Sequence, residues 1–324
     1  MQITPIEGKT FGAVVTDVSL ENLTDDEFPD IRSAFNRYGF LVFPGQFLSV
    51  DGNTAFAKRF GKLHYDAHPM ANKERREDGS YGDTVPYQSQ RMRGVFGNQN
   101  WHTDSSYMPI SSKCGILSAV TVPEWGGETE FADMRAGYAA LDQETKDRIE
   151  NLYAYHSTKQ SAARDLGDLP PEDGKSIFHD EAYLRPIVKV HPETGIKNLF
   201  IGRHAFGVQG LSREESIDLL TSLRDFVVSD PSRVYSHRWT PGDTVIWDNR
   251  SLLHRARPYD YSQLREFVAV RVAGDPETEF AYDPSDPRAQ AGRDVLAAEM
   301  VFLRDEAKDK RYKGTTAPEA RARA

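Results

Sequence analysis

Two histidines and one aspartate in the sequence have the types and spacing that could bind a metal ion. His102 and Asp104 are two residues apart in the polar and aromatic segment 98–107. On an extended strand such residues point to the same side, so an imidazole and a carboxylate there could bind one cation together. His254 lies much later in the chain, shortly after the predicted strand 243–247. Two histidines and a carboxylate on β-structure form the facial triad of non-haem Fe(II) oxygenases, which leaves other coordination positions open.

Two further residues could bind a carboxylate beside such a metal. Arg265 stands at the start of the last predicted strand, shortly after His254. Its guanidinium could make a bidentate pair with a carboxylate, and the Thr129 hydroxyl could add a hydrogen bond if the two runs are adjacent. For Arg265 alone, an ordinary surface position is the alternative.

The composition narrows the class of protein. The chain has 324 residues, 39% of them hydrophobic, which is enough for a sizeable core. A net charge of −9 argues against nucleic acid as the main partner. A single cysteine, Cys114, rules out an intrachain disulfide and a Cys-rich zinc site. No apolar run is long enough to span a membrane, so we expect a cytoplasmic protein.

The elements that must position these residues are predicted from hydrophobic periodicity and turn residues. In the first predicted helix, for example, Thr24 is a plausible N-cap and the apolar residues repeat at helical spacing. The predicted strands are 12–17, 39–45, 116–122, 184–190, 199–202, 234–239, 243–247 and 265–272, and the predicted helices are 25–38, 49–60, 133–155, 212–228 and 288–312.

Two long segments show no clear period. Residues 62–95 are rich in charged residues, Gly and Pro, and are predicted to be a long loop, either an active-site lid or a surface insertion. Residues 157–182 are also predicted to be a loop, and residues 313–324 a frayed tail. Many short strands with a few helices indicate a mainly β domain, a sandwich or barrel decorated by helices.

Three motifs give the sequence a specific resemblance. They are residues 96–107 (FGNQNWHTDSSY), 126–135 (GGETEFADMR) and 245–256 (VIWDNRSLLHRA), followed by Arg265. In this order they resemble the taurine and 2,4-dichlorophenoxyacetate dioxygenase family, with the likeness running over residues 1–275 as one domain. Residues 276–324 would be a C-terminal helical extension and tail.

The resemblance implies a mainly β fold with flanking helices, whose core is a double-stranded β-helix (jelly roll). It also implies Fe(II), 2-oxoglutarate and O2 as cofactor and co-substrates. By position, His102, Asp104 and His254 would hold the iron. Thr129 and Arg265 would bind the distal carboxylate of 2-oxoglutarate, and Trp247 would pack beside it.

The closer likeness is to the phenoxyalkanoate branch of the family. Residues 117–123, 132–142 and 191–205 carry it. It implies hydroxylation of a small carboxylate-bearing substrate, with an aryloxyalkanoate and cleavage of its ether as the leading case. The same chemistry on an alkylsulfonate, a purine or a natural-product intermediate is the alternative, and a non-catalytic jelly-roll binding protein is another.

Substrate contacts are less well defined by the sequence. Asn98 matches a substrate-contacting position of the taurine enzymes, whereas Ala269 stands where those enzymes have an arginine, which weakens the sulfonate interpretation. Arg271 lies at an even offset from Arg265, so it should point to the same side and could reach an anionic group. Arg203 and His68 are further candidates. The expected partner is a small anionic molecule, without nucleic acid or membrane, and a homo-oligomer is left open.

Overall fold

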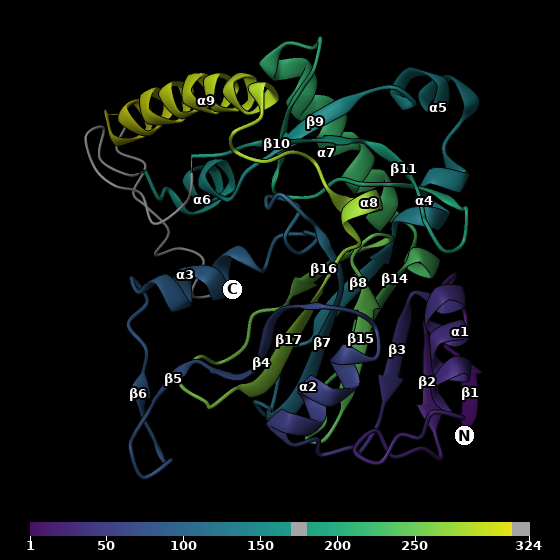
Figure 1. The fold of residues 1–324 in the computed structure, drawn as a ribbon. Coiled ribbons are helices and arrows are strands. Elements are labelled where there is room, and N and C mark those ends of the chain that lie inside the picture. Colours follow the sequence, from purple (N-terminus) through teal and green to yellow (C-terminus); the bar gives the residue numbers. More distant parts are fainter. Residues whose placement is uncertain (170–179, 313–324) are drawn as a thin grey trace.

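Two β-sheets form the centre of the protein (Figure 1). The computed structural model describes residues 1–169 and 180–312. Within these residues the larger sheet has seven strands, in the order β1 (Gln2–Pro5), β2 (Ala13–Thr16), β3 (Phe40–Phe43), β15 (Thr244–Asp248), β7 (Ser112–Thr121), β17 (Glu266–Ala273) and β4 (Leu63–Ala71). The second sheet has the order β14 (Val234–His237), β8 (Thr129–Asp133) and β16 (Leu252–Ala256).

The two sheets pack face to face, and the alternation of side chains along their strands defines an inner and an outer side. On β17, Phe267 and Ala269 belong to the inner cluster, which also contains Phe131 of β8 and Leu252 of β16. Because successive side chains on a strand point to opposite faces, alternate residues further along β17, Val270 and Val272, lie in the outer core instead. The site residues on β8, β16 and β17 therefore converge between the sheets.

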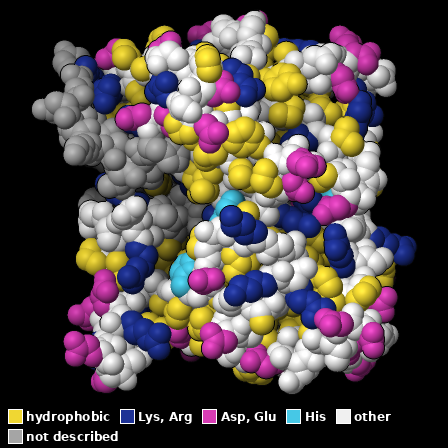
Figure 2. All heavy atoms as spheres, viewed as in Figure 1, with side chains coloured by type: hydrophobic (Ala, Val, Ile, Leu, Met, Phe, Trp, Pro, Cys, Tyr) yellow, Lys and Arg dark blue, Asp and Glu magenta, His cyan; other side chains and the backbone are white. Residues whose placement is uncertain are grey.

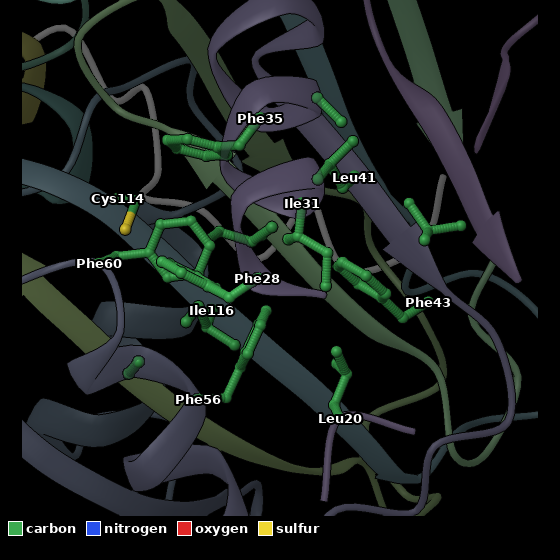
Figure 3. Packing of buried hydrophobic residues seen from close by; sticks show 14 of the residues in the cluster. Leu20, Phe28, Ile31, Phe35, Leu41, Phe43, Phe56, Phe60, Cys114 and Ile116 are labelled. Atoms are coloured by element: carbon green, nitrogen blue, oxygen red, sulfur yellow. The ribbon is translucent and has the colours of Figure 1, made fainter. Parts of the chain in front are cut away.

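Helices α1 (Phe28–Tyr38) and α2 (Val50–Lys58) cover the outer side of the larger sheet. Figure 3 shows Phe28, Ile31 and Phe35 of α1 packed with residues of β3 and β7, including Cys114. Cys114 is fully buried, as expected of a packing residue. The predicted start of the first helix was three residues too early, because residues 25–27 form a turn.

A second helical layer covers the outer side of the three-stranded sheet. Helices α4 (Met134–Ala140) and α7 (Arg213–Ser229) contribute apolar residues to one core cluster there. Beside them lie the smaller sheets β10 (Tyr183–Pro186), β9 (Tyr153–His156) and β13 (Ala205–Val208), and β11 (Val188–Val190) with β12 (Lys197–Leu199). The C-terminal helix α9 (Pro287–Tyr312) packs near α6 (Thr158–Leu166) at the top of Figure 1.

The prediction of a continuous loop over residues 62–95 was wrong. This segment contains β4, the short hairpin β5 (Lys73–Arg75) and β6 (Tyr81–Thr84), and helix α3 (Gln90–Gly97). Strand β4 pairs antiparallel with β17 at the edge of the larger sheet. Its side chains are mostly half-buried or exposed, so the strand is held by backbone hydrogen bonds and shows no apolar period.

Other element boundaries also differ from the predictions. The helix predicted over 133–155 is divided into α4, α5 (Gln143–Ile149) and β9, because Leu141 is extended and the Asp142 carboxylate caps α5. The loop predicted over 157–182 includes α6, capped by Ser157, while residues 170–179 lie outside the described residues, as does the predicted tail 313–324. The predicted strand 184–190 is two strands.

Several predicted elements were confirmed. Helix α7 matches the predicted helix 212–228 and begins with a capping box between Ser212 and Glu215, and β11 and β12 form an antiparallel hairpin. Strands β14 and β15 match the predicted strands 234–239 and 243–247, but they belong to different sheets. The remaining elements are the 3-10 turn η1 (Pro231–Arg233) and helix α8 (Pro276–Glu279). No helix in the described part of the chain combines the length and apolar character needed to cross a membrane.

Candidate active site

His102, Asp104 and His254 meet between the two sheets. One ligand atom from each residue lies within 4.8 Å of the others, and all three residues are buried. The backbones of His102 and His254 are paired in an antiparallel bridge, with N–H···O distances of 3.0 and 2.9 Å in the two directions. This bridge joins the segment after α3 to β16, which is why residues so distant in sequence share one site.

The two imidazoles are oriented with one nitrogen toward the centre of the triad. Nδ1 of His102 lies 2.8 Å from the carbonyl oxygen of Asn100, and donation to that oxygen leaves Nε2 free of a proton. Nε2 of His254 lies 3.6 Å from Oδ2 of Asp104. Burial lowers the pKa of His102 well below its usual value and that of His254 to about 4. Both rings are therefore neutral near pH 7, as metal ligands must be.

Asp104 is held at both its backbone and its side chain. Its N–H donates to Oδ1 of Asn249 at 3.1 Å, and Nη2 of Arg271 donates to Asp104 Oδ1 at 2.6 Å. Burial alone would raise the pKa of Asp104, but the positive Arg271 lowers it below the ordinary value, with smaller contributions from the two histidines. The carboxylate is therefore ionised.

Two neutral imidazoles and one carboxylate, buried and converging, fit a divalent first-row metal such as Fe(II). Nδ1 of His254 is buried without a hydrogen-bond partner in the described residues, so the ring is held by packing against Trp247 and Phe131. The ring centroids of Trp247 and His254 are 4.9 Å apart, which places Trp247 beside the triad. Figure 2 shows histidine side chains at the surface near the middle of this face, next to Lys and Arg side chains.

Arg265, the residue before β17, lies over the inner residue Phe267 and has no carboxylate partner in the described residues. Its Nη2 donates to the Gly127 carbonyl at 3.2 Å, and its Nε is buried without a partner. Burial lowers the pKa of Arg265 to about 10, so it is still a cation at pH 7. A cation whose Nε is buried without a partner is costly unless an anion binds to it. Arg265 is thus a ready receptor for a ligand carboxylate.

Thr129 of β8 has the donor capacity that such a carboxylate would use. Its buried Oγ1 accepts a hydrogen bond from Nε1 of Trp239 at 3.0 Å, so its own hydroxyl proton is available for donation. A cavity of about 310 Å³ is lined by Arg265, Trp239, Phe267 and residues of the turn around Gly127.

Gly127 is the residue that allows this turn to approach Arg265. Its φ is +72°, and a Cβ there would lie 3.3 Å from Nε of Arg265. Its N–H donates to the Pro258 carbonyl at 3.0 Å, which fixes the turn against the chain leading to Arg265. A side chain at this position would be strained and would crowd the guanidinium.

The four predicted substrate residues lie in different surroundings. Asn98 and His68 are exposed. Arg203 pairs with Asp165 at 3.0 Å, and its guanidinium fills the space left by Gly97. Arg271 points to the same side as Arg265, as its even offset predicted, and is engaged by Asp104.

Two residues that the sequence did not single out surround the triad. Oδ1 of Asn249 accepts two hydrogen bonds, one from the Asp104 N–H and one from Nε1 of Trp247 at 3.0 Å. Asn249 therefore links the triad to β15. Tyr107 packs on the buried His204, with ring centroids 4.6 Å apart, and the His204 ring is 6.2 Å from that of His102. Both residues lie inside the motifs that resemble the family, residues 96–107 and 245–256. Their place in these motifs is the sequence feature that could have marked them as site residues.

A larger cavity of about 1050 Å³ lies on the outer side of β16. It is bounded by residues of α7, α9 and β13, together with Trp101, Arg203 and Arg255. None of its described lining residues belongs to the triad.

Comparisons with known proteins agree with this geometry. The chain belongs to the taurine catabolism dioxygenase TauD, TfdA family, whose model matches residues 2–271. It is 45% identical to an (S)-phenoxypropionate/alpha-ketoglutarate-dioxygenase of Sphingobium herbicidovorans, over 86% of this chain and 97% of that protein. It is 38% identical to an alpha-ketoglutarate-dependent 2,4-dichlorophenoxyacetate dioxygenase of Cupriavidus pinatubonensis, over 82% and 95% of the two chains.

A solved structure is similar as well. The crystal structure of AAD-2 in complex with Mn(II) and N-oxalylglycine superposes with a TM-score of 0.78 at 35% identity, covering 87% of this chain and all of that one. The chain is therefore an Fe(II)- and 2-oxoglutarate-dependent dioxygenase of the phenoxyalkanoate branch, as its motifs predicted.

Proposed function

We propose that this enzyme oxidises aryloxyalkanoic acids, with 2-aryloxypropionates as the preferred class, and cleaves their ether bond. The observation that carries the proposal is the 45% identity, over nearly the full length of both catalytic regions, to a dioxygenase named for (S)-phenoxypropionate. The expected enantiomer is accordingly S.

In this proposal His102, Asp104 and His254 hold Fe(II), while Arg265 and Thr129 bind the distal carboxylate of 2-oxoglutarate with Trp247 packed beside it. The support is the convergence of three donors within 4.8 Å and the partnerless guanidinium nitrogen of Arg265. When bound, the iron and 2-oxoglutarate supply the oxygen-activating chemistry, in which 2-oxoglutarate is converted to succinate and CO2.

The chain's own residues would then bind and aim the substrate. One oxygen atom from O2 is inserted into the C–H bond of the carbon that bears the ether oxygen, which gives a hydroxyl group there, and the other oxygen atom enters succinate. The resulting hemiketal collapses: the bond from this carbon to the ether oxygen breaks, the hydroxyl proton passes to the leaving aryl oxygen, and a 2-aryloxypropionate yields a phenol and pyruvate. Substrate orientation is the protein's contribution, because the hydrogen to be removed must face the metal. Asn98, Arg203, Arg271 and His68 remain candidates for contacting the substrate.

The packing of two sheets supports the double-stranded β-helix expected for the core, with residues 1–275 as one catalytic domain and 276–324 as an extension. Within it, β4 and the β5–β6 hairpin are proposed to border the substrate entrance, because β4 pairs with β17 at Arg271 and Ala269. The cytoplasmic location and a homo-oligomer stay predictions.

The test is a product assay with iron-loaded protein. Both enantiomers of 2-phenoxypropionate, phenoxyacetate, taurine and an alkyl sulfate are supplied with 2-oxoglutarate. We expect phenol, pyruvate and succinate in equal amounts from the S enantiomer. Absence of turnover with every aryloxy acid, in protein whose metal site is occupied, would reject this substrate class and favour the alternative of another small anionic metabolite.

A further inference from the structure

Asp104 presents its two carboxylate oxygens to different partners. Oδ1 accepts a hydrogen bond from Nη2 of Arg271 at 2.6 Å, whereas Oδ2 faces His254 at 3.6 Å from its Nε2. We propose that Arg271 is a positioning residue for the metal site, which holds Asp104 so that only Oδ2 is offered to the metal. This inference rests on the proposed assignment of the triad to the metal.

Arg271 is itself held firmly enough to do this. Its Nη1 donates to Oγ of Ser105 at 3.2 Å, and its guanidinium lies 5.4 Å from the ring centre of Tyr65 on the neighbouring strand β4. Its side chain is 20% exposed. A guanidinium that contacts Asp104 and Ser105 together fixes both the position and the rotation of the carboxylate.

The backbone after Asp104 also depends on this contact. Ser105 has a φ of +56°, a left-handed conformation that costs a non-glycine residue about 1 kcal/mol. The Ser105 carbonyl accepts a hydrogen bond from the Met108 N–H at 3.0 Å, and the Ser105 hydroxyl accepts one from Nη1 of Arg271. These bonds stabilise the sharp turn that aims the Asp104 side chain at the two histidines.

The orientation matters because a facial triad must leave coordination positions open. A carboxylate free to rotate could bind a metal through both oxygens and occupy one of those positions. Because Arg271 donates a hydrogen bond to Oδ1, only Oδ2 of Asp104 faces the metal position. Hydrogen-bonding partners of metal ligands typically change metal affinity by about 10- to 100-fold when they are removed.

Two neutral substitutions separate the hydrogen bond from the charge. R271M removes both, whereas R271Q removes the charge but retains an amide N–H₂ that can donate to Oδ1. We would titrate Mn(II) into the metal-free full-length protein without 2-oxoglutarate or substrate and follow free Mn(II) by electron paramagnetic resonance. We expect R271M to bind Mn(II) at least about tenfold more weakly than R271Q, with R271Q close to wild type.

The competing roles predict other results. If Arg271 acted only as a charge, both variants would bind Mn(II) more tightly, because a positive group near the cation is gone. If it served only the substrate, neither would change Mn(II) affinity. Either outcome would overturn the proposal. Should R271M fail to fold, R271L takes its place. It also removes both the charge and the hydrogen bond, so we expect Mn(II) to bind at least about tenfold more weakly than in R271Q, and equal affinities would overturn the proposal.

R255M is the matched control. Arg255 follows His254 on β16, pairs with Glu130 at 2.6 Å and lies 4.6 Å from the ring centre of Trp101, but its side chain points to the outer side. Its loss should leave Mn(II) affinity unchanged. If H254A binds Mn(II) as tightly as the wild type, the assignment of the triad to the metal is wrong. If H254A loses Mn(II) affinity but R271M does not, only the role of Arg271 is rejected.

Discussion

Replacing Arg265 by methionine should separate ligand binding from stability. The guanidinium forms no ion pair in the described residues, its Nε has no partner, and its one side-chain hydrogen bond goes to the Gly127 carbonyl at 3.2 Å. The protein therefore keeps a half-buried cation that has no carboxylate partner among the described residues until a ligand carboxylate binds. R265M removes this cation and retains most of the apolar contact with Phe267, over which the guanidinium lies at 4.1 Å.

The expected magnitudes differ greatly between the two measurements. A hydrogen bond between charged groups contributes about 1.5–3 kcal/mol. Losing a bidentate pair should therefore weaken the binding of 2-oxoglutarate by at least about 3 kcal/mol, or roughly 100-fold in affinity. For the metal-free protein, loss of the bond to Gly127 and relief of the partnerless Nε are each about 1 kcal/mol with opposite signs. The free energy of unfolding should therefore stay within about 1 kcal/mol of wild type.

The assay is succinate formation at varied 2-oxoglutarate, together with urea unfolding of the metal-free chain. R250M is the control, because Arg250 is a buried arginine that does have ionic partners, Asp248 at 2.6 Å and also Glu193. Breaking that pair should cost about 3–5 kcal/mol of stability. A change in the 2-oxoglutarate KM below about threefold in R265M, or a destabilisation comparable to that of R250M, would refute the reasoning.

Three further predictions concern the same site. H102A should reduce Fe(II)-dependent turnover to background while circular dichroism stays native, and residual turnover would remove His102 from the ligand set. W239F, which deletes the donor to Thr129, should raise the KM for 2-oxoglutarate about three- to tenfold at constant kcat, and an unchanged KM would show that the Thr129 hydroxyl needs no orientation. His254 has a pKa of about 4 in the folded protein, so between pH 7 and 4 the unfolded chain binds more protons than the folded one. The free energy of unfolding of the metal-free protein should therefore fall by roughly 3 kcal/mol over this range. In H254Q, urea unfolding at several pH values should show a smaller fall.

The sequence predicted the triad and Arg265 because each lies in a local pattern with a chemical meaning. It predicted that Arg265 and Arg271 share a side because strand periodicity is exact over so short a distance. It failed at β4, whose pairing with β17 is a contact between backbones and requires no apolar alternation. It also missed the break at Leu141, where a helical pattern of Ala and Leu continues through an extended residue and a new N-cap decides the geometry.

Roles that depend on which partner a side chain reaches could not be predicted either. Arg271 and Arg265 are the same residue type on the same side of one strand, and the sequence suggested an anionic ligand for both. In the structure Arg271 pairs with Asp104, whereas Arg265 has no carboxylate partner within residues 1–169 and 180–312. That choice depends on the left-handed turn at Ser105, which brings the Asp104 carboxylate back toward β17 and is set by tertiary contacts.

This difference between the two arginines also determines the charge that a substrate meets. The histidines are neutral, and Asp104 and Arg271 cancel each other, so Arg265 leaves one positive charge in the metal-free site. A divalent metal and the dianion of 2-oxoglutarate cancel as well, and the loaded site keeps one positive charge. Ala269, between the two arginines, adds none. Because charges interact strongly where water is scarce, a monoanionic carboxylate should be favoured over its neutral ester. The methyl ester of the preferred acid should therefore show a much higher KM, and equal values would mean that the substrate carboxylate lies outside this field.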